Sequence, residues 1–400
     1  MRILVITNYY PPYYKGGYEL ACRDCCDYLA ARGHQVFILS GHYGLDFPLE
    51  NTAYEEMNAV RRLRYIDYRT PSYLDKHRVE KHNYAATSEA IEAVKPDIIY
   101  VWNMQAVSLA PVLAVQKSGI KRIFEIGDLW PGIYIDDHPA TRLKAFIKSM
   151  LPGLVGGRVE VSPVIAVSRW IGIEMAEKYG SKRVYVVPNG IKEPQNVKTK
   201  RNENVTKYIF TGRIDPQKGI ETAIEAFAKL ARTQAISDFQ FDIYGSGDEI
   251  YAEHCRRLVD KYGLENRVKF CGRVDNVINL YADYDIMLMP TTMREPFGMV
   301  TVEAMAAGLP VIATNKYGPA EIITNGKDGL LFEPGNISQL AEKIALLHND
   351  SNLYRTLAAA ARKKYLDNYK LEFIKNKVEK ILMAEISGSE NEFSAAARLF

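Results

Sequence analysis

The chain has 400 residues, of which 47% are hydrophobic and 25% are charged, and its formal net charge is +3 at pH 7. This length is more than one hydrophobic core ordinarily serves, so we expect two domains. The nearly balanced charge argues against a nucleic-acid-binding protein, whose binding domain would be strongly basic. No apolar run approaches the roughly 18 residues of a membrane span.

The five cysteines predict neither a disulfide framework nor a zinc site. Cys22 and Cys25 form a CxxC motif within a helical pattern, and neither a second such motif nor a flanking pair of histidines accompanies it. Small buried or half-buried thiols in a reducing compartment are the favoured interpretation. We therefore expect a cytoplasmic protein without a bound metal.

Short apolar runs that favour strands alternate with helical patterns along the whole chain. The strands expected in the first half lie at residues 3–7, 36–39, 98–101, 122–126, 164–167 and 185–187. Those expected in the second half lie at 208–211, 241–244, 268–271, 286–289, 311–313 and 329–332. This alternation predicts parallel sheets with helices on both faces, and hence two doubly wound α/β domains.

The domain boundaries follow from changes in composition. The first domain is expected at residues 1–191, a polar linker without periodicity at 192–206, and the second domain at 207–368. Residues 369–400 would form a C-terminal helix, packed back on the first domain, and a tail, with a helix break near 368–371. Ligands bind at the carboxyl ends of the strands in open α/β sheets, so the domains are expected to face each other across a cleft.

Two cations follow the strand that ends at Thr211. Arg213 and Lys218 lie on a glycine-bearing loop that precedes a helical pattern. Arginine can bind a diphosphate bidentately and lysine can bind it as a point charge. A diphosphate site is therefore one interpretation, and a solvated loop of charged residues is the alternative.

Two further turns follow the next strands. Gly245 and Gly247 match half of a dinucleotide fingerprint, but the third glycine is absent, so a tight strand-to-helix turn is favoured over a cofactor site. Arg273 and Val274 follow the strand at 268–271, where backbone groups could pair with the edge of a nucleobase.

Two carboxylates lie eight residues apart around the start of a predicted helix. Glu295 is expected on the preceding loop, and Glu303 one or two turns into the helix. The helix start leaves three backbone N–H groups free to bind an anion, those of Gly298, Met299 and Val300. Acids for sugar hydroxyls beside donors for phosphate predict a nucleotide-sugar site, and a carboxylate that only favours the helix dipole is the alternative.

Together these motifs resemble the retaining glycosyltransferases of family 4, also called group 1, over the whole chain. The resemblance rests on Gly212-Arg213…Lys218-Gly219, Glu295-x7-Glu303, Gly318-Pro-Ala-Glu321, the glycine loop at Gly16-Gly17 and the turn Pro188-Asn-Gly-Ile191. It implies the GT-B fold, in which two Rossmann-like domains face each other across a cleft.

The resemblance also implies a role for each matching residue. Arg213 and Lys218 would hold the donor diphosphate and stabilise the leaving group. Glu295 would contact the donor sugar and Glu303 the ribose. Further donor contacts are implied for Phe297, Gly298, Met299, Val300, Arg273, Val274 and Gly245.

In the first domain, Gly16 and Gly17 would let the first loop approach the donor phosphate and the acceptor. The sequence departs from the family at Gly127, where many members carry a histidine followed by an aspartate. Asp128 of that pair is present and is kept as a catalytic candidate.

The implied reaction is a retaining, front-face hexosyl transfer from a UDP- or GDP-sugar to an acceptor hydroxyl, without a metal or other cofactor. Fixed cations and helix N–H groups would stabilise the departing diphosphate. A nucleotide-sugar epimerase of the same architecture is the main alternative, and a dehydrogenase and a non-catalytic binder are the others. No acid/base pair for C2 of the sugar is evident beyond the transferase set.

The expected partners are the nucleotide-sugar donor and a glycan, lipid-linked or small-molecule acceptor, with no nucleic acid. Residues 141–151 alternate basic and apolar side chains at helical spacing. An ordinary surface helix is favoured there, but such a helix can also lie on an anionic bilayer. Peripheral contact with the inner membrane surface is therefore a second hypothesis.

Overall fold

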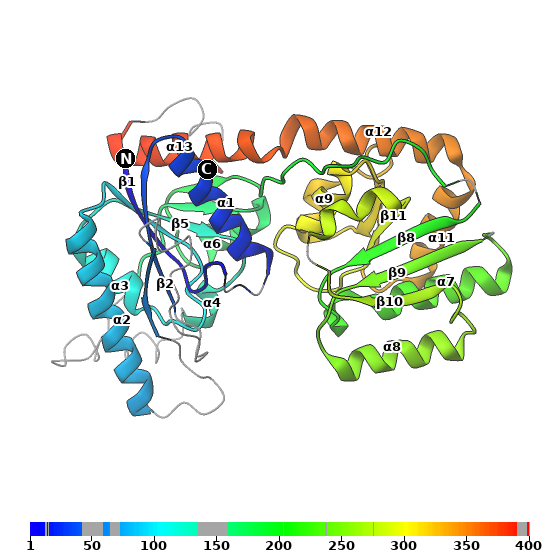
Figure 1. Ribbon diagram of the computed structural model, residues 1–400, viewed down its shortest axis with the longest axis horizontal. Helices are drawn as coiled ribbons and strands as arrows, with labels where there is room; N and C mark the ends of the chain where they lie inside the picture. The colour runs from blue at the N-terminus through cyan, green and yellow to red at the C-terminus, as the bar shows by residue number, and fades with distance from the viewer. Residues whose placement is uncertain are drawn as a thin grey trace. The chain divides into compact units, whose positions relative to one another are not determined.

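The computed structural model describes residues 1–12, 14, 16–41, 59–64, 73–134, 159–202, 204–236, 238–274, 276–389 and 398–399. The chain forms two compact units (Figure 1). Unit 1 comprises Met1–Pro188 and Ile374–Phe400, and unit 2 comprises Asn189–Phe373. The segment at 141–151, on which the membrane hypothesis rests, lies outside the described residues.

Unit 1 is built on a seven-stranded sheet whose neighbouring strands pair in parallel. The strand order is β3-β2-β1-β4-β5-β6-β7. The strands are β1 (Arg2–Ile6), β2 (Gln35–Gly41), β3 (Ala59–Leu63), β4 (Ile98–Val101), β5 (Arg122–Ile126), β6 (Val164–Ala166) and β7 (Val184–Val186). The helices are α1 (Gly17–Ala31), α2 (Tyr73–Val94), α3 (Ala110–Ser118), α4 (Pro131–Tyr134), α6 (Arg169–Glu177) and most of α13 (Leu371–Ser387).

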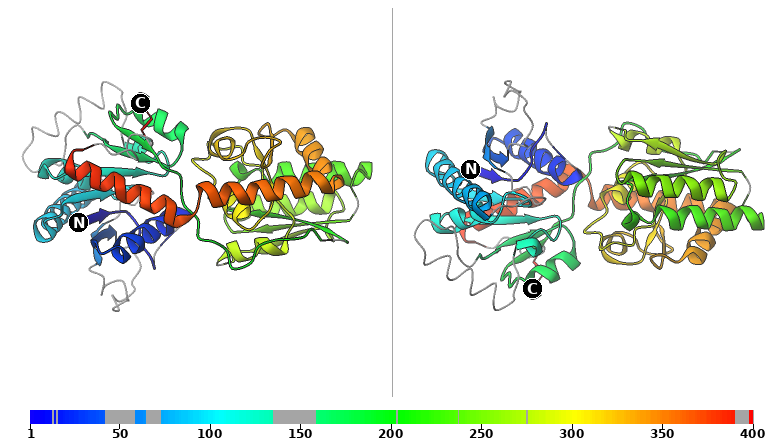
Figure 2. Two further views of the ribbon diagram at one scale, coloured as in Figure 1. Left: turned by 90° about the horizontal axis from the view of Figure 1, so that it is seen from above. Right: turned by 90° about the horizontal axis from the view of Figure 1, so that it is seen from below.

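Unit 2 repeats this architecture with a six-stranded parallel sheet of order β10-β9-β8-β11-β12-β13. The strands are β8 (Thr206–Thr211), β9 (Phe239–Tyr244), β10 (Val268–Gly272), β11 (Ile286–Met289), β12 (Val311–Thr314) and β13 (Leu330–Phe332). The helices are α7 (Ile220–Thr233), α8 (Glu249–Lys261), α9 (Met299–Ala306), α10 (Tyr317–Ile322), α11 (Ile337–Asn349) and α12 (Ser351–Asn368). The opposite views in Figure 2 show α7 and α8 over one face of this sheet and α12 over the other.

The predicted pair of doubly wound α/β domains is confirmed, and every expected strand lies within two residues of its expected bounds. Only β3 was missed among the strands of the described residues, because two arginines interrupt its apolar run. Among the described strands it pairs with β2 alone, and it is the edge strand of this sheet. The sheet order reverses at β1 in unit 1 and at β8 in unit 2, and ligands bind at such switch points in open α/β sheets.

The segment predicted as a linker is held against unit 2. The N–H of Lys198 donates to the carbonyl of Ala307 at 2.8 Å. The backbone and side-chain amides of Asn202 donate to the Asp285 carboxylate at 2.9 and 2.8 Å. Lys198 also forms an ion pair with Asp285 at 3.1 Å, and both side chains are buried.

Helix α13 belongs to the core of unit 1 although it follows unit 2 in sequence. The expected helix break is confirmed, since α12 ends at Asn368 and α13 begins at Leu371. The apolar side chains that α13 contributes to the core are Ile374, Val378, Ile381 and Leu382. They share this core with Cys22, Cys25 and Cys26, whose burial confirms the interpretation as packed thiols. None of the described helices combines the length and hydropathy needed to cross a bilayer.

Candidate functional site

The loop after β8 is fastened to the loop after β11. Asp215 caps the short helical turn Pro216–Lys218 by accepting the N–H of Gln217. The carbonyl of Gln217 in turn accepts the N–H of Thr292 at 2.8 Å. Gly219 has a φ of +70°, and a Cβ at this position would lie 1.9 Å from the carbonyl oxygen of Pro290, so only glycine fits. These contacts fix the backbone that carries Lys218.

Lys218 and Glu295 are paired with each other. The Lys218 Nζ lies 2.7 Å from the Glu295 Oε2, and the two side chains are 17% and 14% exposed. The two residues were predicted to bind different parts of the donor, Lys218 the diphosphate and Glu295 the sugar. In the structure they form one partly buried ion pair at the carboxyl ends of β8 and β11.

Arg213 lies on the same loop in a different environment. Its side chain is 67% exposed, and it forms an ion pair with Asp215 at 3.3 Å. An exposed pair of this kind contributes little to stability. The guanidinium can therefore exchange its partner for an anionic ligand at small cost.

The carboxylate of Glu303 is tied to the end of β8 through a tyrosine. The Tyr281 hydroxyl lies 3.3 Å from the Glu303 Oε2, to which it donates, and 2.6 Å from the Thr211 hydroxyl. Burial raises the pKa of Glu303 to about 7, while the hydrogen bond from Tyr281 acts in the opposite direction. Tyr281 was not expected at the site, because only its fold-dependent proximity to Thr211 reveals it.

The raised pKa of Glu303 predicts a pH-dependent stability. The folded state keeps this proton up to about pH 7, whereas the unfolded carboxyl loses it near 4.5. Its contribution to the free energy of unfolding should therefore fall by up to about 3 kcal/mol as the pH rises through that interval. Denaturant unfolding at pH 5 and pH 8 should show Glu303→Gln gaining stability over the wild type at the higher pH.

The surface residue Glu342 provides the control for this measurement, because Glu342→Gln removes the same formal charge from the exposed side of α11. A Glu303→Gln difference that stays constant between pH 5 and pH 8 would contradict the prediction.

The start of α9 presents backbone donors. Gly298 has a φ of +98°, and in the described part of the chain no acceptor is paired with the N–H groups of Gly298, Met299 and Val300. Phe297 is buried and its carbonyl oxygen would lie 2.3 Å from a Cβ at Gly318, so Gly318 allows the two loops to touch. This approach sets the direction of the helix start, and its free N–H groups favour an anion.

The turn after β9 packs against the loop after β8. A Cβ at Gly245 would lie 1.8 Å from the carbonyl oxygen of Gly212, and one at Gly247 would lie 2.3 Å from that of Ile214. Asp248 then caps α8 by accepting the N–H of Tyr251. The structure thus shows the favoured tight turn and gives Gly245 a packing role.

Arg273 and Val274 directly follow β10 and are exposed. The N–H of Gly245 donates to the carbonyl of Gly272 at 2.8 Å, which holds this loop beside the turn after β9. The contact of Arg273 and Val274 with a nucleobase stays a prediction.

The remaining predicted residues lie in unit 1, where the carboxyl ends of β1, β4 and β5 meet. Gly16 and Gly17 begin α1, and the Glu19 carboxylate accepts the N–H of Gly16 at 2.9 Å. Asp128 follows β5 and accepts the N–H of Trp130 at 2.8 Å and the Asn103 side-chain amide at 3.4 Å. Burial raises the pKa of Asp128 to about 6.

Three residues beside these in unit 1 were missed: Tyr18, Glu19 and Asn103. Glu19 could have been found, because an acid three residues after the helix start is a capping signal. Tyr18 and Asn103 lie near Asp128 only because of the strand order, and no local sequence pattern marks them.

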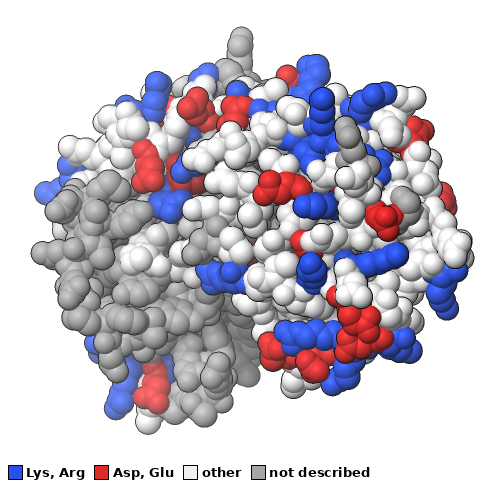
Figure 3. Space-filling model, turned by 45° about the vertical axis from the view of Figure 1, so that its right-hand side comes forward, with Lys and Arg blue, Asp and Glu red and all other residues white. Residues whose placement is uncertain are grey.

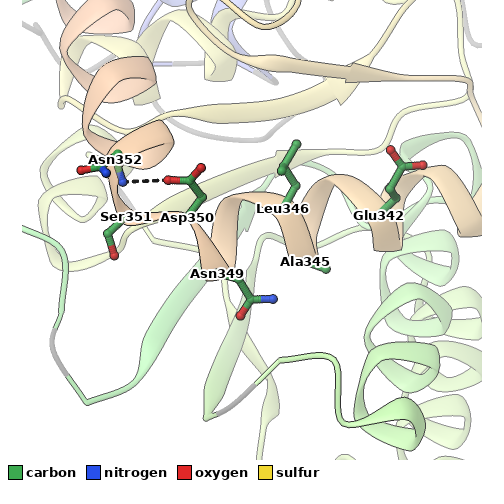
Figure 4. Close-up of a pocket in the computed structure, with 7 residues that line it drawn as sticks. All are labelled: Glu342, Ala345, Leu346, Asn349, Asp350, Ser351 and Asn352. Atoms are coloured by element: carbon green, nitrogen blue, oxygen red, sulfur yellow. Dashed lines mark hydrogen bonds between the residues drawn. The ribbon is translucent and has the colours of Figure 1, made fainter.

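A surface depression in the described part of unit 2 differs from the predicted site in its lining. The depression at the junction of α11 and α12 is lined by Glu342, Ala345, Leu346, Asn349, Asp350, Ser351 and Asn352 (Figure 4). Asp350 already accepts the N–H groups of Asn352 and Leu353 there. Figure 3 shows acidic and basic side chains interspersed over one face, in keeping with the small net charge.

Two family models together match most of the chain. The model described as Glycosyltransferase Family 4 matches residues 15–193, and the model described as glycosyl transferases group 1 matches residues 191–364. An uncharacterized glycosyltransferase of Methanocaldococcus jannaschii is 26% identical over 92% of this chain and 94% of its own length. The N-acetyl-alpha-D-glucosaminyl L-malate synthase of Bacillus anthracis is 27% identical over 98% and 99% of the two chains.

Solved structures show the same fold. A glycosyltransferase from Rickettsia africae superposes with a TM-score of 0.73 at 22% identity, covering 97% of this chain and all of its own. The Anabaena protein HepE, solved in complex with UDP, superposes with a TM-score of 0.72 at 22% identity, covering 96% of this chain and all of its own.

Proposed function

We infer the reaction of this chain from the family to which it belongs, the GT-B glycosyltransferases of group 1 and family 4. The chain is a glycosyltransferase of glycan synthesis. We propose that it moves a hexose from a nucleoside-diphosphate sugar to an acceptor hydroxyl with retention of the anomeric configuration. Both matched models describe glycosyltransferases, which leaves the epimerase and dehydrogenase alternatives without support.

One observation carries the proposal. Lys218, Glu295 and the open helix start at Gly298 belong to loops that hydrogen bonds join at the switch point of unit 2. A diphosphate and a sugar hydroxyl are the two groups that this combination of cation, carboxylate and N–H donors can bind together.

Each group has a role in the proposed reaction. The bond between the anomeric carbon and the diphosphate oxygen breaks while the acceptor oxygen attacks the same face of the sugar. Lys218, Arg213 and the N–H groups of α9 stabilise the charge that develops on the departing diphosphate. The leaving phosphate oxygen takes the proton of the acceptor hydroxyl. Because the acceptor attacks the anomeric carbon directly, no covalent intermediate forms.

The other residues position the two substrates. Glu303 accepts hydrogen bonds from the ribose hydroxyls, and Glu295 accepts them from the donor sugar. The roles of Asp128 and of the loop at Gly16–Gly17, both in unit 1, stay predictions. Since Arg213, Lys218 and the N–H groups at the start of α9 can all bind the diphosphate, we propose that transfer needs no metal, and that EDTA leaves its rate unchanged.

A thermal-shift screen tests the donor. UDP-sugars come first, because HepE was solved with UDP, followed by GDP- and ADP-sugars. A donor at 100 times its Kd should stabilise the folded state by about 2.7 kcal/mol, which corresponds to a rise in Tm of roughly 5–10 °C for a unit of this size.

Nuclear magnetic resonance of the product then tests the stereochemistry. A product with the anomeric configuration of the donor supports the proposal, and an inverted product contradicts it. Absence of a shift with every nucleotide sugar would contradict the donor class. Contact with a membrane surface and a cytoplasmic location stay predictions.

A further inference from the structure

The residue before Asp128 has no room for a side chain. A Cβ at Gly127 would lie 2.1 Å from Cε2 and 2.4 Å from Cδ2 of Tyr18. These are ring atoms of a half-buried tyrosine, whose ring centroid lies 5.5 Å from that of buried Trp102. Tyr18 therefore cannot give way without leaving this packing.

The hydroxyl of Tyr18 forms two hydrogen bonds with the backbone at the end of β5. It donates to the carbonyl of Glu125 at 2.6 Å and accepts the N–H of Gly127 at 3.2 Å. Tyr18 is the second residue of α1, directly after Gly17. One side chain therefore ties the glycine loop of unit 1 to the end of β5.

We infer that Tyr18 is a positioning residue for Asp128, since its ring fills the space beside Gly127 and its hydroxyl holds the backbone from which the carboxylate extends. This inference rests on the proposed function only for the role of Asp128. It also explains the departure from the family at Gly127: the volume of a histidine there is taken by a side chain from α1.

The ring of Tyr18 also limits the access of water to the Asp128 carboxylate. The groups that face this carboxylate are the Trp130 N–H, the Asn103 amide, the Glu19 carboxylate and Tyr18 itself. Removal of the ring admits water to the loop, and water favours the ionised carboxylate.

A titration of Asp128 tests the inference without any ligand. In protein labelled with carbon-13 at the aspartate carboxyl, and with Asp128→Asn to assign the signal, Tyr18→Ala should lower the pKa of Asp128 by about one unit or more. Tyr134→Ala is the matched control, because the Tyr134 hydroxyl also bridges a backbone N–H and a carbonyl, those of Ala106 and Met104. It should leave the pKa of Asp128 in place.

A double-mutant cycle tests the packing independently. Gly127→Ala should lower the Tm by at least about 3 °C, and by less than half as much in a Tyr18→Ala background, because the clash is then gone. Equal losses in both backgrounds, or an unchanged pKa of Asp128 in Tyr18→Ala, would overturn the inference. Both readouts remain valid if the chain binds no nucleotide sugar, so failure of the proposed function is distinguishable.

Discussion

Glu295→Gln is expected to slow sugar transfer by at least about 100-fold and, at the same time, to bind the free nucleoside diphosphate about 3- to 10-fold more tightly. The two effects have opposite signs because they depend on two different interactions of Glu295. It contacts the donor sugar in the proposed reaction, and it pairs with Lys218 at 2.7 Å in the structure. Loss of the carboxylate removes the sugar contact and releases the ammonium for phosphate.

Calorimetric titration with the nucleoside diphosphate found in the donor screen measures the binding, and nucleotide release measures the transfer. Lys218→Ala should weaken diphosphate binding and slow sugar transfer. Glu342→Gln on α11 makes the same change in formal charge away from the site and serves as the control for long-range electrostatics. Weaker diphosphate binding by Glu295→Gln, of the size caused by Lys218→Ala, would show that the ion pair does not compete with the ligand.

Asp285→Ala is expected to lower the free energy of unfolding of unit 2 by about 3–5 kcal/mol. The side chain is fully buried and accepts two hydrogen bonds from Asn202 and one from the N–H of Lys207. Its removal also leaves the ammonium of Lys198 buried without its ion-pair partner. The cost is therefore that of an uncompensated charge, in addition to the lost hydrogen bonds.

The location of the tryptophans allows the two units to be followed separately. All three, Trp102, Trp130 and Trp170, belong to unit 1, whereas circular dichroism reports on the helices of both units. Asp285→Ala should shift the dichroism transition to lower denaturant more than the fluorescence transition. Asp283→Ala changes an exposed acid two residues away and should cost less than about 0.5 kcal/mol. Equal effects of the two substitutions would contradict the prediction.

The parts of the fold that could be predicted are those that depend on short segments of the sequence. The central strands are uninterrupted apolar runs, and the glycines after β8 and before α9 mark the turns of the site. Contacts between distant segments could not be predicted this way. Lys218 and Glu295 are 77 residues apart, and Tyr18 and Gly127 are 109 residues apart. Each pair meets only because strand order brings the carboxyl ends of particular strands together.

The place of α13 has a consequence for the order in which the chain can fold during synthesis. Domains generally fold from the N-terminus as the ribosome releases them. Here the core of unit 1 includes Ile374, Val378, Ile381 and Leu382, which leave the ribosome only after all of unit 2. Unit 1 is thus synthesised first, but its core is completed last. Until α13 has been synthesised, the apolar side chains of α1 that pack against it are exposed to solvent or covered by a chaperone.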